Sequence, residues 1–154
     1  MSTTEKIIKS EQKYNSIVET TADAVFESKK TRLVLVAGPS CSGKTTTTRK
    51  LVEHLEHHGI HSHMISIDDF YKDIVKDEAE RDFESLESID LDNLHEVLSK
   101  LSAGERADIP NFDFTEARKI GIRDSIVLGE HDIAMIEGLH ALNPAIYKNF
   151  VDED

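Results

Sequence analysis

Cysteine, tryptophan and proline are scarce in this chain of 154 residues, which has one cysteine, Cys41, no tryptophan and three prolines. A single cysteine excludes an internal disulfide bond, so we expect a reducing, cytoplasmic setting. No apolar run approaches the roughly 20 residues of a membrane-spanning helix, so no membrane partner is expected. The first residues, 1–6, lack an apolar segment behind a basic flank, and we expect no secretory signal.

Positive charge is also in short supply. The chain has 30 acidic and 18 basic side chains, which gives a formal net charge of -12. This negative field repels polyanions, so a nucleic acid is not an expected partner. A nucleotide is compatible with the charge, because a phosphate-binding loop grips phosphate with local backbone N–H groups and one lysine.

Short apolar runs alternate with amphipathic stretches along the chain. The predicted strands are residues 32–37, 61–67 and 132–136, and the predicted helices are residues 4–28, 44–58 and 90–102. After Arg32 the first strand is a short apolar run with β-branched valines, so we expect it to be buried on both faces. Strands that alternate with helices pair in parallel through right-handed crossovers, so the fold class is α/β.

Three stretches are less regular. The helix over residues 4–28 is expected to be broken near Thr20 and Thr21. Pro110 excludes a helix around residues 109–114, which we expect to be extended or looped. Residues 120–128 are expected to form a short hairpin arm.

One motif binds phosphate. The pattern G-x-x-x-x-G-K-[ST] is met in full by Gly38, Gly43, Lys44 and Thr45, between a predicted strand and a predicted helix. The glycines let several backbone N–H groups turn toward one anion, Lys44 reaches the β- and γ-phosphates, and the Thr45 hydroxyl ligates Mg²⁺. We therefore expect ATP or GTP together with Mg²⁺ as cofactors. The residues expected to hold the nucleotide are Gly38, Pro39, Ser40, Cys41, Ser42, Gly43, Lys44, Thr45 and Thr46.

Acidic side chains follow the other two predicted strands. Asp68 and Asp69 come after the second strand, and Glu137 after the third. Ligands of open parallel sheets sit beyond the carboxyl ends of the strands, so these groups are expected near the loop. One acid can then hold Mg²⁺ while another accepts the proton of an attacking hydroxyl. The alternative is that Asp68 and Asp69 cap a helix. The two interpretations are compatible if Asp68 takes part in the chemistry and Asp69 caps the helix.

Five motifs in order resemble the uridine kinase and phosphoribulokinase family, most closely its bacterial-type uridine kinase-like branch. They are Gly38–Thr46, Ser66–Tyr71, Asp82–Asp90, Ile109–Phe114 and Ile136–Pro144. The resemblance implies a P-loop fold of three layers, α/β/α, with a mostly parallel sheet. It also implies transfer of the γ-phosphate of ATP or GTP to a sugar hydroxyl, with Asp68 as catalytic base beside Lys44 and with Glu137 near Mg²⁺.

The resemblance also assigns an acceptor site. Tyr71 would line a nucleoside pocket, Glu84 would bind the ribose hydroxyls, and Phe112 would pack near the base. Arg118 resembles a basic residue of the acceptor site. Phe112 lacks the phenolic hydroxyl of the tyrosine common at this position, and the spacing from Phe112 to Arg118 is slightly compressed, so base selectivity stays open.

Members of this family continue past Pro144 into a lid with arginines, further strands and the adenine pocket. The printed chain ends at Asp154, so we expect it to be truncated on the C-terminal side. Residues 1–30 are interpreted as an N-terminal amphipathic helical segment and residues 31–154 as the P-loop kinase domain. A homo-oligomer is compatible with a sheet that needs its open edge covered.

Three functions remain open. The leading hypothesis is a nucleoside kinase that phosphorylates the 5′-hydroxyl of uridine or cytidine. The second keeps the kinase but changes the acceptor to another small hydroxyl metabolite, such as a pentose phosphate or pantothenate. The third is a nucleotide-binding module without catalysis, because it lacks the lid.

Overall fold

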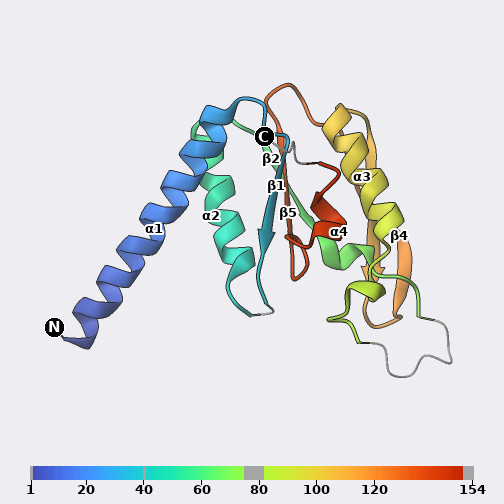
Figure 1. Ribbon diagram of the computed structural model, residues 1–154, viewed down its shortest axis with the longest axis horizontal. Helices are drawn as coiled ribbons and strands as arrows, with labels where there is room; N and C mark the ends of the chain where they lie inside the picture. Colours follow the sequence, from blue (N-terminus) through green and yellow to red (C-terminus); the bar gives the residue numbers. More distant parts are fainter. Residues whose placement is uncertain (1, 40, 75–81, 151–154) are drawn as a thin grey trace.

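Three parallel strands lie between two layers of other elements (Figure 1). The structure is a computed structural model, and it describes residues 2–39, 41–74 and 82–150. The sheet has the order β1 (Leu33–Ala37), β5 (Ile133–Gly138), β2 (Ser62–Ser66), with β5 parallel to both neighbours. One face is covered by α1 (Thr3–Ser28) and α2 (Lys44–His57). The other is covered by α3 (Leu91–Ala103), the hairpin of β3 (Ala107–Asp113) and β4 (Arg118–Ile126), and α4 (Pro144–Tyr147). The α/β class with three layers is therefore confirmed.

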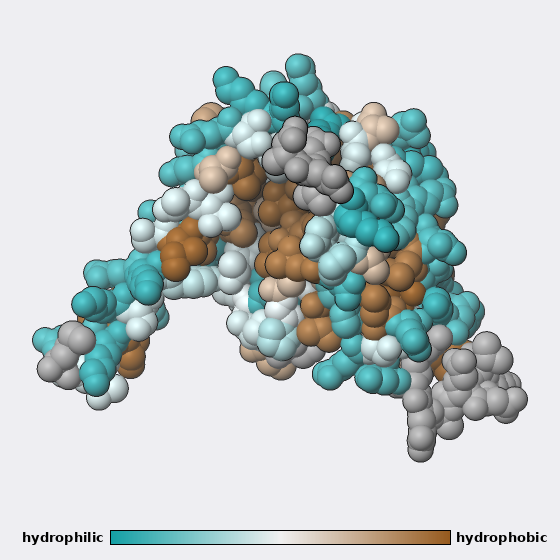
Figure 2. Space-filling model, in the orientation of Figure 1, coloured by the Kyte–Doolittle hydropathy of each residue, from teal (hydrophilic) through white to brown (hydrophobic). Residues whose placement is uncertain are grey.

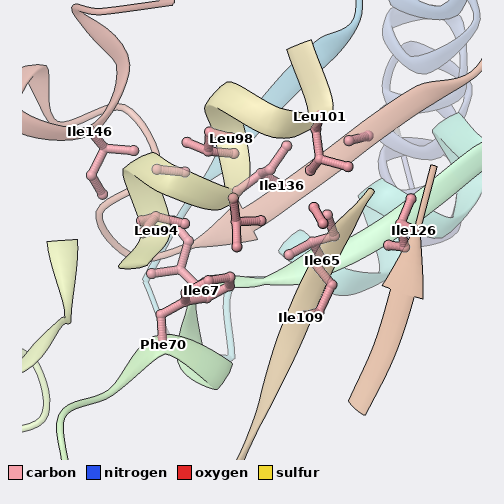
Figure 3. Close-up of a cluster of buried hydrophobic side chains, with 14 of the residues drawn as sticks. Ile65, Ile67, Phe70, Leu94, Leu98, Leu101, Ile109, Ile126, Ile136 and Ile146 are labelled. Atoms are coloured by element: carbon pink, nitrogen blue, oxygen red, sulfur yellow. The ribbon is translucent and has the colours of Figure 1, made fainter. Parts of the chain in front are cut away.

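The central strand β5 supplies both halves of the core. Ala134 and Ile136 pack toward α3 and the hairpin, whereas Ile133 and Met135 pack toward α2 and α1. Side chains of a strand alternate between faces, so one strand buried on both sides joins two apolar clusters. Figure 3 shows Ile136 among side chains of α3 and the neighbouring strands.

A capping side chain and two glycines mark the ends of helices α2 and α3. The Asp90 side chain accepts the Asn93 N–H at 3.2 Å at the start of α3. Gly59 follows α2 and Gly104 follows α3, with φ of 77° and 72°. Glycine adopts such positive φ without a Cβ clash, so the predicted ends of both helices are confirmed.

Two expectations about the first elements are wrong. Helix α1 runs unbroken, because the hydroxyls of Thr20 and Thr21 donate to the carbonyls of Ser16 and Ile17 at 2.8 Å and so stay within the helix. Strand β1 is partly buried over residues 33–37 rather than fully buried. Within the described residues it pairs only with β5, so it forms an edge of the sheet.

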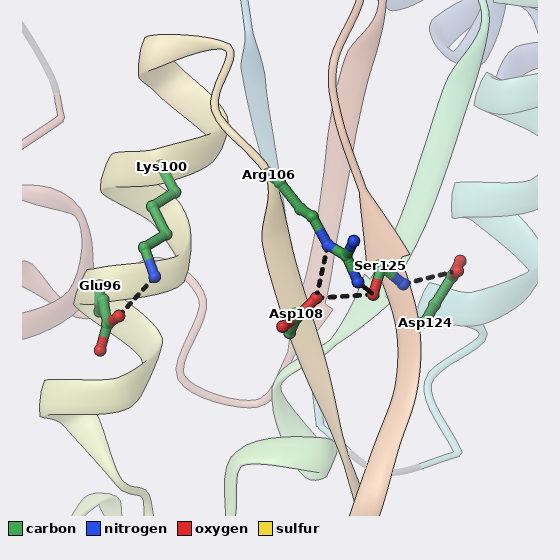
Figure 4. A network of polar contacts seen from close by, with 6 residues as sticks. All are labelled: Glu96, Lys100, Arg106, Asp108, Asp124 and Ser125. Atoms are coloured by element: carbon green, nitrogen blue, oxygen red, sulfur yellow. Dashed lines mark hydrogen bonds and ion pairs between the residues drawn. The ribbon is translucent and has the colours of Figure 1, made fainter.

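The β3–β4 hairpin is longer than the predicted arm. Residues 109–113 are extended and Phe114 lies in the turn that follows, while Pro110 lies inside β3 where the pairing register shifts. Figure 4 shows a network of hydrogen bonds across the hairpin. Asp108 accepts one hydrogen bond from Arg106 Nε at 3.2 Å and one from Ser125 Oγ at 2.6 Å. These hydrogen bonds lower the pKa of Asp108.

Among the described residues, no helix combines the length and apolar character needed to cross a membrane.

Candidate phosphate and acceptor site

The segment between β1 and α2 has the backbone shape of an anion cradle. Cys41 and Gly43 have positive φ of 60° and 85°, and the Ser42 N–H donates to the Pro39 carbonyl at 3.2 Å. Alternation of right- and left-handed residues turns successive N–H groups toward one point. Gly43 caps α2 without a side-chain hydrogen bond, so the first-turn N–H groups are not used by the cap.

The two ends of the loop are constrained in different ways. A Cβ on Gly38 would lie 2.7 Å from Ser42 Oγ, so a larger residue at 38 would require the Ser42 hydroxyl to move. Thr45 and Thr46 lie in the first turn of α2 and are exposed, with the Thr45 side chain free of any capping role. Ser40, also expected to bind nucleotide, lies outside the described residues.

Lys44 and Glu137 meet at the carboxyl edge of the sheet. Lys44 Nζ lies 4.0 Å from Glu137 Oε2, and the two side chains are only 15% and 12% exposed. In the strand register Glu137 lies between Val36 of β1 and Ser66 of β2. The predicted convergence of the loop with the acid after β5 is therefore present.

Glu137 Oε2 is buried, and no described residue gives it a hydrogen bond. A buried carboxylate oxygen that lacks a partner costs free energy unless a cation or donor satisfies it. Carboxylate and hydroxyl oxygens are ligands that Mg²⁺ prefers, so Glu137 and the Thr45 hydroxyl fit this ion. No three His, Cys, Asp or Glu side chains gather as a metal cluster within the described ranges. Mg²⁺ here would therefore depend on phosphate oxygens and water for its other ligands.

Asp68 lies in η1 (Ile67–Phe70), a short 3₁₀ helix that directly follows β2. Ser66 caps this helix, because its Oγ accepts the Asp68 N–H at 3.3 Å. The Asp68 side chain is exposed at the edge that also carries Lys44 and Glu137. The capping alternative for Asp68 and Asp69 is wrong, since Ser66 does the capping.

Asp69 has a different role. It is 7% exposed, and its Oδ1 lies 2.7 Å from Arg123 Nη2 of strand β4. Burial raises the pKa of Asp69, and the charge of Arg123 offsets part of that rise. Arg123 also donates to Asn111 Oδ1 at 2.9 Å. Sequence analysis did not identify Arg123. The sequence shows it only as a charged residue within the predicted hairpin.

Four aromatic rings form a cluster beside Asp68. Tyr71, Phe83, Phe112 and Phe114 have ring centroids between 5.1 and 6.0 Å apart. Phe112 is buried, whereas Phe114 is 56% exposed and offers a free ring surface. Tyr71 and Phe112 were expected here, but Phe83 and Phe114 were missed because separate segments bring them together.

Tyr71 is held as a neutral phenol. It is 8% exposed, and its hydroxyl donates to the Phe83 carbonyl at 2.6 Å. Burial, followed by the charge and hydrogen bond of Asp68, raises the pKa of Tyr71 to about 12. The ring therefore contributes apolar surface and hydrogen bonding at neutral pH.

The two other expected acceptor residues, Glu84 and Arg118, are exposed. Glu84 is exposed, and its carbonyl accepts from His140 Nε2 at 2.6 Å, which ties the segment before η2 (Leu86–Ser88) to the loop after β5. Arg118 begins β4 and forms an ion pair with Glu116 through Nε at 2.8 Å. The ribose role of Glu84 and the acceptor role of Arg118 stay predictions.

Comparison with known proteins identifies the family. The model of the phosphoribulokinase / uridine kinase family matches residues 33–152. The chain belongs to this family. The uridine kinase of Schizosaccharomyces pombe is 32% identical over 130 residues, which cover 80% of this chain and 28% of that protein. The uridine kinase of Staphylococcus aureus strain JH9 is 30% identical over 128 residues, which cover 80% of this chain and 60% of that protein.

A solved kinase shares the fold at lower identity. The D-glycerate 3-kinase of Cryptococcus neoformans var. grubii superposes with a TM-score of 0.59 at 24% identity, over 80% of this chain and 52% of that one. The present chain spans 28% of the length of the Schizosaccharomyces pombe uridine kinase and about 60% of the length of the two staphylococcal uridine kinases, from Staphylococcus haemolyticus and Staphylococcus aureus strain JH9. The family resemblance drawn from the five motifs is confirmed.

Proposed function

We propose that this chain binds ATP or GTP with Mg²⁺ on residues 38–46 and transfers the γ-phosphate to the 5′-hydroxyl of uridine or cytidine. The observation that carries the proposal is the convergence of three groups at one sheet edge. Lys44 lies in the loop after β1, Asp68 follows β2, and Glu137 ends β5. Donor binding and base chemistry both need groups at this edge.

The proposed reaction is an in-line displacement at the γ-phosphorus. The 5′-hydroxyl oxygen forms the new P–O bond as the bond to the bridging β–γ oxygen breaks, and ADP or GDP leaves. Asp68 accepts the hydroxyl proton. Its carboxylate is exposed, so water can remove this proton after the reaction. Lys44 neutralises charge on the β- and γ-phosphates. Mg²⁺ held by Glu137 and Thr45 would supply further charge neutralisation at the transferred group.

The aromatic cluster supports a nucleoside as acceptor. An exposed ring such as Phe114, next to Tyr71 and Phe112, suits stacking against a flat base. Glu84 is exposed, and its carboxylate can accept hydrogen bonds from ribose hydroxyls. A pentose phosphate, pantothenate or glycerate has no aromatic ring to use this surface, which favours the nucleoside reading.

A coupled assay of ADP release tests the proposal on the 154-residue chain. The acceptors are uridine, cytidine, ribulose 5-phosphate, pantothenate and D-glycerate, each with Mg²⁺ and ATP. We expect release that depends on uridine or cytidine and that falls about 10²- to 10⁴-fold in Asp68→Asn, the usual worth of a catalytic base. Asp92→Asn, an exposed acid in the first turn of α3, is the matched control and should keep full activity.

Calorimetry separates the kinase from a module that only binds nucleotide. The kinase hypothesis predicts that the Asp68→Asn variant binds Mg–ATP as tightly as the unmodified chain but loses turnover. Nucleotide binding with no acceptor-dependent ADP from any compound of the panel would favour the module instead. Turnover with pantothenate or a sugar phosphate alone would keep the chemistry and correct the acceptor.

A further inference from the structure

A short segment before η2 is held at two neighbouring peptide groups. We call residues 82–85, which include Glu84, the acceptor segment. The Tyr71 hydroxyl donates to the Phe83 carbonyl at 2.6 Å, and His140 Nε2 lies 2.6 Å from the Glu84 carbonyl. A carbonyl oxygen only accepts hydrogen bonds, so His140 donates through a proton on Nε2. The acceptor segment is therefore tied to two other parts of the chain.

Both side chains that hold this segment come from loops that carry an acid of the proposed reaction. Tyr71 follows Asp68 by three residues after β2, and His140 follows Glu137 by three residues after β5. Three residues of chain span at most about 11 Å. Each loop therefore supplies one acid to the reaction and, a short distance away, one hydrogen bond to the acceptor segment.

The loop that carries His140 is packed and hydrogen-bonded on both sides of this residue. A Cβ on Gly138 would lie 2.8 Å from Ile67 Cβ, so the end of β5 and the start of η1 are in close contact. Beyond His140, Ala141 is fully buried, and the Asn143 N–H donates to the His140 carbonyl at 2.8 Å. The His140 side chain therefore extends from a well-anchored backbone.

These contacts fix the direction of the Glu84 side chain. The peptide group before Glu84 is held at its oxygen by Tyr71 and at its N–H by Asp82 Oδ1, at 2.8 Å. The peptide group after Glu84 is held at its oxygen by His140. Because peptide groups are planar, the φ and ψ angles of Glu84, and so the direction of its Cα–Cβ bond, follow from these three hydrogen bonds.

The Glu84 carboxylate lies near the catalytic edge. Burial raises the pKa of Tyr71 most, followed by the charge and hydrogen bond of Asp68 and then by the charges of Asp82 and Glu84. Asp68 and Glu84 are both exposed, so an acceptor can reach either carboxylate from solvent. In Figure 1 the acceptor segment lies at the lower right of the body, where Figure 2 shows hydrophilic and apolar side chains interleaved. Such a surface suits a ligand that has both hydroxyls and a flat ring.

We propose that His140 is a positioning residue for the nucleoside acceptor. Its hydrogen bond to the Glu84 carbonyl aims the Glu84 carboxylate at the ribose hydroxyls and so holds the 5′-hydroxyl within reach of Asp68. The inference rests on the proposed function, because it needs a ribose bound at Glu84. The donor site should not depend on His140, since the hydrogen bond of this side chain goes to the acceptor segment.

The His140→Ala variant tests the proposal in an assay of uridine phosphorylation. We expect KM for uridine to rise about 3- to 10-fold, the range that corresponds to the loss of one hydrogen bond. The kcat at saturating uridine and the Kd for Mg–ATP should change less than about twofold, because Lys44, Asp68 and Glu137 stay in place. His140→Gln should restore KM to within about twofold of the unmodified chain, since the glutamine amide can donate to the same carbonyl.

His95 offers a matched control. Its Nε2 lies 2.7 Å from the Ala145 carbonyl, so it makes the same kind of hydrogen bond, but to α4 rather than to the acceptor segment. His95→Ala should therefore leave KM for uridine unchanged, although it loses a hydrogen bond of similar length.

Hydrogen exchange of the backbone amides, measured by mass spectrometry without any acceptor, tests the positioning by itself. We expect exchange over residues 82–88 to be at least about threefold faster in His140→Ala and unchanged in His95→Ala. Unchanged exchange over this stretch in His140→Ala, or a KM for uridine that stays the same or rises equally in His95→Ala, would overturn the role of His140. An unmodified chain that transfers no phosphate to uridine would instead overturn the proposed function, and the acceptor role of His140 with it.

Discussion

Asp69 Oδ1 lies 2.7 Å from Arg123 Nη2, and this ion pair fastens the β3–β4 hairpin to the short helix that carries Asp68. The Asp69 side chain is 10% exposed and that of Arg123 is 54% exposed. The pair therefore satisfies a buried carboxylate with a cation that reaches in from the surface.

Arg123→Gln should lower the free energy of unfolding by about 1–3 kcal/mol, because it leaves the buried Asp69 carboxylate without its charged partner. The double variant Arg123→Gln/Asp69→Asn should recover part of the loss. Urea unfolding followed by circular dichroism measures both. Arg106→Gln, an exposed change at the base of the same hairpin, is the control. Equal losses in Arg106→Gln and Arg123→Gln would show that the Asp69 contact contributes no more than the exposed Arg106–Asp108 pair.

Glu137→Gln should separate stability from nucleotide binding. Glu137 Oε2 accepts no hydrogen bond from the described residues and has Lys44 Nζ only at 4.0 Å, so relief of the buried charge and loss of this long ion pair should nearly cancel, and the amide should change stability by less than about 1 kcal/mol. The same change should weaken Mg–ATP binding at least about tenfold, since even groups that only support a metal's ligands are worth about 10- to 100-fold in affinity. Thermal unfolding and calorimetric titration with and without Mg²⁺ check the two effects. A variant that is destabilised and still binds Mg–ATP normally would contradict the assignment of Glu137 to the metal.

The aromatic cluster should divide into a structural ring and a binding ring. Phe112→Ala removes a buried ring and should cost about 3–5 kcal/mol of stability. Phe114→Ala, at an exposed ring, should cost less than about 0.5 kcal/mol but raise KM for uridine roughly tenfold through lost stacking. Unfolding curves and initial rates at varied uridine distinguish them. Unchanged KM for uridine in Phe114→Ala would remove this ring from the acceptor site.

Tyr71 should make the protein sensitive to alkali. Its pKa is raised from 10.0 to about 12, so the folded state keeps a proton that the unfolded state loses. The stabilisation is fully present below pH 10 and is lost as pH rises toward 12, by about 2–3 kcal/mol in total. Tyr71→Phe should flatten this fall. Tyrosinate absorbance during titration gives the pKa, and a phenol that titrates near pH 10 would contradict the buried hydrogen bond.

Local patterns were sufficient to predict the elements that hold the phosphate. The loop motif, the apolar run of β5 and the extents of α2 and α3 each depend on residues close together in the chain, so sequence reasoning found them. The same holds for Asp68 and Glu137, whose positions follow from the ends of parallel strands. These features are set by chain geometry near the residue itself.

Features that depend on distant segments were missed. Arg123 reaches Asp69 only because the hairpin folds over η1, and Phe114 meets Phe83 only through the same docking. The position of β1 at the sheet edge likewise depends on strand order, which its apolar sequence does not encode. The predicted break at Thr20 and Thr21 was wrong because a threonine hydroxyl can interrupt a helix or donate a hydrogen bond to a carbonyl of the preceding turn, as both do here.

Transfer of labelled γ-phosphate from ATP to uridine by the 154-residue chain tests the central claim most directly. The account predicts labelled uridine 5′-monophosphate whose formation needs Mg²⁺ and falls at least about 10²-fold in Asp68→Asn, while affinity for ATP is kept. Label that reaches no acceptor despite tight Mg–ATP binding, or an Asp68→Asn variant as active as the unmodified chain, would contradict it.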